Sequence, residues 1–183
     1  MVEHLWFGDE DGRTPEEAAF LTELRRQACT WTVPGLDPQE ETSSLTLLTP
    51  LYVDLGVPGL DDAPVNFLEV AYWGTTPAQS QLQGAWGAKG YLLDGPSNPG
   101  DLEVKTTGVA AAPEQLARWA AEWMLRQLQR PVLRQDWLSG DQVAASAWRW
   151  ADDGGSLAST GPRRSRRRPA DRQVLAWSGE AGS

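Results

Sequence analysis

Strand-like segments joined by short connectors fill the middle of the chain and most constrain its fold. The connectors are rich in proline and glycine, which mark turns. Connections this short favour antiparallel neighbours, because a parallel pair needs a long crossover. The pattern predicts an antiparallel sheet built from four segments, at residues 45–54, 65–73, 82–93 and 102–107.

Each segment carries a further signal about its place in the sheet. Residues 65–73 are apolar on both faces, which is typical of a central strand. Pro50 has no backbone N–H to donate, so its segment belongs at an edge or a bulge. Gly84, Gly87 and Gly90 lie inside the third segment and predict a bent or bulged strand.

One helix is predicted before these strands in the sequence, and a second helix after them. Thr14, Pro15 and Glu17 form a helix start, with a capping residue, a proline in the first turn and a capping-box glutamate. This helix is expected over residues 15–28. A second helix begins at Pro113 and ends before Pro131, and its apolar side chains recur at helical spacing. That stripe is expected in the core and consists of Leu116, Trp119, Ala120, Trp123, Met124 and Leu128.

The expected fold class is therefore α+β, with an antiparallel sheet of about four to five strands packed by two helices. Residues 132–138 are a strand or a helical turn, and residues 143–150 are ambiguous. Residues 152–172 consist mainly of Gly, Ser, Pro and Arg, which indicates disorder. We expect one α+β domain over residues 1–151 and a flexible, basic C-terminal tail over 152–183 with a short apolar end.

Length and composition place the chain among compact cytoplasmic proteins. Its 183 residues suit a single hydrophobic core. The sequence contains no apolar run of 18 residues, so no membrane-spanning segment is predicted. The acidic first ten residues do not resemble a secretory signal. Cys29 is the only cysteine, as expected in a reducing cytoplasm. Fourteen arginines against two lysines, with no isoleucine, indicate a bacterial source with GC-rich codons.

Charge is distributed unevenly along the chain. Residues 1–162 hold 10 basic and 23 acidic side chains, a balance of −13, whereas residues 163–183 hold 6 and 2, a balance of +4. The acidic body repels nucleic acid and anionic membranes. The tail could contact nucleic acid, anionic lipid or the acidic body, or stay solvated. The residues expected to make such a contact are Arg163, Arg164, Arg166, Arg167 and Arg168.

Ten tryptophans are an unusual number for this length. About half are expected in the core, because the chain has few other large apolar side chains. Tryptophan is also enriched at protein interfaces, where it anchors contacts. The tryptophans expected to bind a partner are Trp31, Trp148, Trp150 and Trp177.

Most catalytic signatures are absent from the sequence. His4 is the only histidine, which excludes a two-histidine metal site and disfavours a Ser-His-Asp triad. A single cysteine cannot form a paired-cysteine zinc site. No Walker-type phosphate loop is present, and no Gly-x-Gly-x-x-Gly follows a strand.

One constellation of charged residues has catalytic potential. Asp94 ends a strand-like segment, and the next segment carries Glu103-Val-Lys105. This order resembles the active site of the PD-(D/E)xK nuclease superfamily. The resemblance implies that Asp94 and Glu103 share a Mg²⁺ ion and that Lys105 orients the attacking water. The competing interpretation is a Glu–Lys pair on a solvated strand face.

The leading hypothesis is a non-enzymatic, acidic protein–protein interaction module without a cofactor or metal. Its partner would be a protein with a basic surface, and the acidic body would steer the encounter. An adaptor, a chaperone and an immunity-like protein all fit this description. The alternative hypothesis is a Mg²⁺-dependent nuclease.

Overall fold

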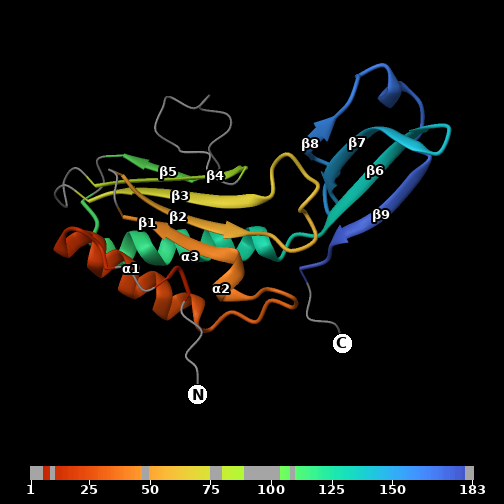
Figure 1. Ribbon diagram of the computed structural model, residues 1–183. Helices are drawn as coiled ribbons and strands as arrows, with labels where there is room; N and C mark the ends of the chain where they lie inside the picture. The colour runs from red at the N-terminus through yellow and green to blue at the C-terminus, as the bar shows by residue number, and fades with distance from the viewer. Residues whose placement is uncertain are drawn as a thin grey trace.

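The computed structural model describes residues 6–8, 11–46, 50–74, 80–88, 104–107 and 110–179. Two antiparallel sheets and two long helices dominate this part of the chain, and the helices pack on one face of the first sheet (Figure 1). The expected α+β class is confirmed. None of the described helices is both long and apolar enough to cross a membrane.

The first sheet has five strands in sequence order, so each strand pairs with its neighbour along the chain. The strand predicted to be central, β3, is in the middle of the sheet. The strands are β1 Thr42–Leu45, β2 Leu51–Gly56, β3 Phe67–Trp73, β4 Gln81–Gly87 and β5 Val104–Thr107.

One predicted strand is two strands in the structure. Leu45 at the end of β1 pairs with Tyr52 in β2, so the segment 45–54 reverses direction. Pro50 lies in the connection, immediately before β2. A proline cannot donate to a ladder, and here it precedes the paired residues instead of forming a bulge among them.

Both helices occupy the positions predicted for them, as α1 Pro15–Ala28 and α3 Pro113–Leu128. The Glu17 N–H donates to Thr14 Oγ1 over 3.2 Å. Glu17 Oε2 accepts from the Arg13 N–H over 2.8 Å, one residue before the donor of a standard capping box. Four N–H groups lack helical partners at a helix start, and this arrangement satisfies two local donors there.

The main core lies between these helices and one face of the first sheet. Alternate β3 residues, Leu68, Val70 and Tyr72, belong to this core because side chains on a strand alternate between faces. Trp123 of α3 is 2% exposed, and Trp119 packs against the core as a partly buried side chain. The predicted apolar stripe of α3 is therefore confirmed as a core stripe.

A second antiparallel sheet follows α3 and was not predicted. Its strand order is β8-β7-β6-β9. The two segments left ambiguous at 132–138 and 143–150 are its central strands. The elements are β6 Val132–Ser139, β7 Gln142–Trp150, β8 Ser156–Thr160, the 3₁₀ turn η1 Ser165–Arg167 and β9 Arg172–Trp177; a further short helix, α2 Pro38–Glu41, precedes β1.

The expectation of a tail without regular structure is thus corrected for β8, η1 and β9. Composition misled here because the outer strands are held by main-chain pairing and by ion pairs, which need few apolar residues. Asp136 of β6 is fully buried and accepts from Arg134, Arg172 and Ser146. Arg172 of β9 is therefore bound to a charge inside the sheet.

Trp177 joins the second sheet to the helical layer. Its indole is 8% exposed, and its Nε1–H donates to the Leu128 carbonyl over 2.7 Å at the end of α3. Val132 and Trp150 lie in the same core cluster as α1 and α3. The two sheets consequently share one core.

Candidate functional site

The nuclease-like constellation lies largely outside the described residues. Asp94 and Glu103 lie outside the described residues. Lys105 is exposed on β5 and pairs with Gln83 of β4. Among the described residues, no group of three or more His, Cys, Asp or Glu side chains could hold a metal ion.

Three of the four tryptophans expected at the surface are buried instead. Trp148, Trp150 and Trp177 are 2%, 6% and 8% exposed. The Trp150 ring lies 5.2 Å from the Trp86 ring, and the Arg130 guanidinium covers it at 3.9 Å. These indoles fill the junction between the sheets, where their large apolar area contributes more than it would at a surface.

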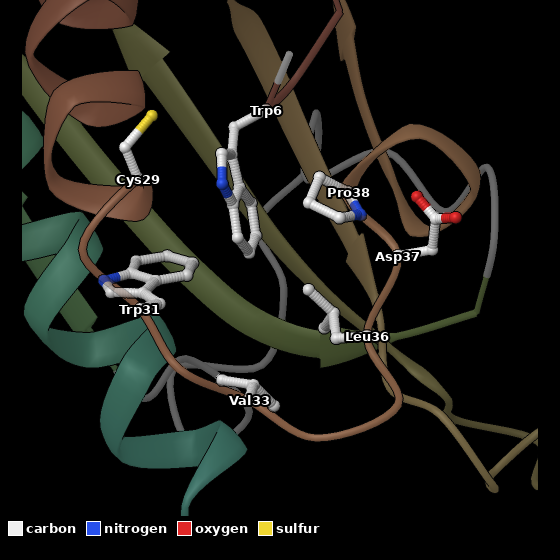
Figure 2. A pocket seen from close by; sticks show the side chains of 7 residues that line it. All are labelled: Trp6, Cys29, Trp31, Val33, Leu36, Asp37 and Pro38. Carbon is white, nitrogen blue, oxygen red and sulfur yellow. The ribbon is translucent and has the colours of Figure 1, made fainter. Parts of the chain in front are cut away.

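Trp31, the fourth, is partly exposed and lines an open groove of about 500 Å³. We call this the indole groove, and Figure 2 shows its lining. The Trp6 and Trp31 rings meet edge to face, with centroids 5.0 Å apart and planes at 77°. The groove is lined by Trp6, Cys29, Trp31, Val33, Leu36, Asp37 and Pro38.

A strained backbone conformation places Trp6 in this groove. Phe7 has φ +58°, a left-handed value that bulky side chains rarely adopt, and Gly8 follows with φ +69°. Surrounding groups hold this turn in place: the Phe7 N–H donates to Thr42 Oγ1 over 2.8 Å, and its carbonyl accepts from Ser44 Oγ over 2.9 Å. Such strain costs about 1–3 kcal/mol and is common at binding sites.

Trp31 forms the opposite wall of the groove, three residues after α1 ends. The Trp31 N–H donates to the Ala28 carbonyl over 2.9 Å, which continues the helical direction as a turn and carries the indole back toward Trp6. At the rim, Asp37 Oδ1 accepts from the Gln39 N–H over 3.0 Å and caps α2. This cap fixes the Asp37 carboxylate at the rim of the groove, where Pro38 lies between it and the two indoles in the view of Figure 2.

The groove lies in an acidic part of the chain. No lysine or arginine occurs between Arg26 and Lys89. The cations at the end of α1 are already engaged, since Arg25 donates to the Trp6 carbonyl and Arg26 pairs with Glu23. The acidic residues of this interval are Asp37, Glu40, Glu41, Asp54, Asp61, Asp62 and Glu69.

The five tail arginines expected at an anionic contact are placed by the second sheet. Arg163, Arg164 and Arg167 are exposed. Arg166 donates to the Thr160 and Gly161 carbonyls, and Arg168 pairs with an aspartate. The structure thus separates the predicted contact residues from the indole groove, in different parts of the fold.

Comparison of the chain with models of known protein families, with curated proteins and with solved structures finds no match.

Proposed function

We propose that the protein is a non-enzymatic interaction module whose indole groove takes a cationic side chain from a basic partner protein. The observation that supports this is the edge-to-face Trp6–Trp31 pair in a groove whose rim carries the Asp37 carboxylate. Tryptophan faces attract cations through the ring quadrupole, and a carboxylate supplies the counter-charge. An arginine can stack on an indole and donate to a carboxylate at once, which favours arginine over lysine.

The surrounding charge supports a basic partner and opposes an acidic one. No lysine or arginine occurs between residues 27 and 88, so the segment that supplies Trp31, Val33, Leu36, Asp37 and Pro38 to the groove carries only negative charge. One cation does contact the groove lining, since Arg25 donates to the Trp6 carbonyl. The Asp37 cap uses Oδ1, which leaves Oδ2 for a ligand. Acidic surroundings speed the approach of a basic protein and penalise an acidic competitor.

The free energy of one cation–π contact limits how much the indole groove can contribute to the affinity for a partner. A cation–π contact contributes about 0.5–2 kcal/mol, which is roughly 2–30-fold in affinity. One seated side chain therefore selects a partner without holding it alone. A stable complex needs about 800 Å² of surface on each partner, so residues beyond the groove lining, such as the exposed Glu40 of α2, would complete the interface.

The test measures binding of a short arginine-containing peptide by the shift of the tryptophan indole N–H signals in NMR. The expected result is that Trp31→Ala and Asp37→Asn each weaken binding, by roughly 2–30-fold for the indole. A peptide with citrulline in place of arginine keeps the shape without the charge and should bind less well. Trp73→Ala is the matched control, because Trp73 is also partly buried but packs in a different cluster.

The proposal is wrong if the citrulline peptide binds as well as the arginine peptide, or if Trp73→Ala weakens binding as much as Trp31→Ala. If the proposal is right, a photo-crosslinking residue introduced at Val33 should capture, in the native host, a protein through one of its basic segments. Trp31→Ala should abolish that capture.

A further inference from the structure

The connection from β8 to β9 contains an ordered turn with five arginines between residues 163 and 168. Three consecutive backbone bonds shape it, from Ser165 N–H to Pro162 O (3.0 Å), Arg166 N–H to Arg163 O (3.2 Å) and Arg167 N–H to Arg164 O (3.4 Å). We call residues 162–168 the arginine turn. A 3₁₀ turn has three residues per turn, so side chains at i and i+3 lie above one another. Arg164 and Arg167 are such a pair.

The arginine turn is fixed to the second sheet at its far end. Trp137 Nε1–H donates to the Arg168 carbonyl over 2.8 Å, and Trp137 itself is 4% exposed. Asp171 accepts from the Leu138 N–H over 2.6 Å, while its own N–H donates to the Asp136 carbonyl over 2.9 Å. A ligand that binds the turn therefore meets a backbone that is already ordered, which lowers the entropy cost of binding.

Its charges are only partly neutralised. Arg168 pairs with Asp171, and Arg166 donates to two carbonyls that carry no net charge. Within the part of the chain that the structure describes, no acidic side chain pairs with Arg163, Arg164 or Arg167. Like charges on one side of a short turn repel each other, and a bound polyanion would relieve that repulsion.

We infer that the arginine turn binds the phosphate backbone of nucleic acid. Guanidinium groups match phosphate oxygens with two parallel hydrogen bonds, which suits closely spaced arginines. The segment 161–171 contains no large apolar side chain to insert into a bilayer, which disfavours a membrane. It also contains no aromatic side chain to stack on bases, so binding should be independent of sequence and of strandedness.

The arginine turn lies far from the indole groove. In Figure 1 the blue segment between β8 and β9 lies at the end of the molecule opposite α1. At physiological salt, exposed charges are screened beyond about 8 Å. The distant acidic residues of the body therefore reduce the affinity without cancelling the local attraction.

Fluorescence anisotropy with a labelled DNA duplex of mixed sequence tests the inference. Each phosphate neutralised should contribute about 0.9 to the slope of log affinity against log salt. Three contacts correspond to roughly a 40-fold loss of affinity between 50 and 200 mM salt. In the variant Arg163→Gln/Arg164→Gln/Arg167→Gln this dependence should be nearly lost, with the melting temperature unchanged because these side chains have no acidic partner to lose.

Single variants separate a local contact from a general charge effect. Arg164→Gln and Arg126→Gln remove the same charge, and both side chains are exposed, but Arg126 lies on α3. Only Arg164→Gln should weaken binding. The inference is overturned if both variants weaken it equally, if the triple variant keeps the wild-type salt slope, or if the protein binds phosphatidylserine vesicles and not the duplex.

Discussion

At the scale of single residues, the Asp136 carboxylate links three strands of the second sheet, since it accepts hydrogen bonds from Arg134 of β6, Ser146 of β7 and Arg172 of β9. Burial alone would raise its pKa, but hydrogen bonds from Arg134, Ser146 and Arg172 outweigh that effect and leave the pKa lowered. The carboxylate is thus more readily ionised in the folded state than in the unfolded chain. Its contribution to stability is complete above the unfolded pKa and is lost as the pH falls through the folded one.

We predict that Asp136→Asn destabilises the fold by about 2–3 kcal/mol near neutral pH, because it removes the fully buried carboxylate that Arg134 and Arg172 share, although Arg134 keeps its ion pair with Asp62. Below about pH 4 the difference from the wild type should shrink. Urea unfolding across a pH series measures it. Glu23, whose pKa is lowered to about 2 chiefly by Arg26, keeps its own pH dependence in both proteins, so the difference between the curves isolates Asp136. A difference that is constant with pH would contradict this account.

The tryptophans of α3 give a second prediction at this scale. Trp123→Ala should lower the free energy of unfolding by about 3–5 kcal/mol, because the side chain is almost fully buried. Trp119→Ala should cost less, since that indole is only partly buried. Denaturant unfolding gives both values. Unchanged stability with loss of partner binding would instead make the stripe an interface.

At the scale of elements, the sequence pattern was sufficient wherever one signal dominated. Prolines and capping residues delimited α1 and α3, and the doubly apolar run marked β3 as central. The second sheet escaped because its outer strands contain few apolar residues: β8 is Ser-Leu-Ala-Ser-Thr, and four residues of β9 are exposed. The position of β9 is reinforced by the Arg172–Asp136 and Trp177–Leu128 contacts, whose partners lie 36 and 49 residues apart in the chain. Local patterns do not contain such distant partners.

Of the two tryptophans that line the indole groove, only one was predicted from the sequence to lie at a binding surface. Trp31 was expected at a binding surface from its residue type, and the structure lines the groove with it. Trp6 was not expected there, because its position depends on the positive φ of Phe7. Nothing in the residues Trp-Phe-Gly requires that conformation; hydrogen bonds from Ser44 and to Thr42, about 35 residues away in the chain, maintain it.

The arrangement of β9 leads to a prediction about proteolysis. Trypsin should cut first in the arginine turn, since Arg163, Arg164 and Arg167 are exposed in a connection between strands. The cut protein should nevertheless stay whole in native gel filtration, because β9 remains paired with β6 and Trp177 remains in the core. Denaturing electrophoresis would reveal the two fragments. Release of the C-terminal fragment under native conditions would restore the view of residues 152–183 as a detached tail.

At the scale of the whole molecule, Mg²⁺ distinguishes the interaction module from the nuclease. Two carboxylates that share a metal site repel each other until a cation binds, so a nuclease would gain melting temperature in millimolar Mg²⁺. We expect no such gain beyond the screening given by an equal ionic strength of NaCl. Asp94→Asn should then change nothing. Mg²⁺-dependent cleavage of DNA or RNA, lost in Asp94→Asn and in Lys105→Ala, would refute the proposed function.

The two sheets differ in how far apart their paired strands lie along the chain. Every pair in the first sheet joins consecutive strands, and such local topologies form quickly. In the second sheet β9 must return to β6 across β7, β8 and the arginine turn, which imposes a larger loop-closure cost. The strand that closes last is also the one that can open without unfolding the rest. Transient opening of β9 would withdraw Trp177 from the core. Among the strand pairings, the β6–β9 pair should therefore be the slowest to form and the first to exchange its amide protons with solvent.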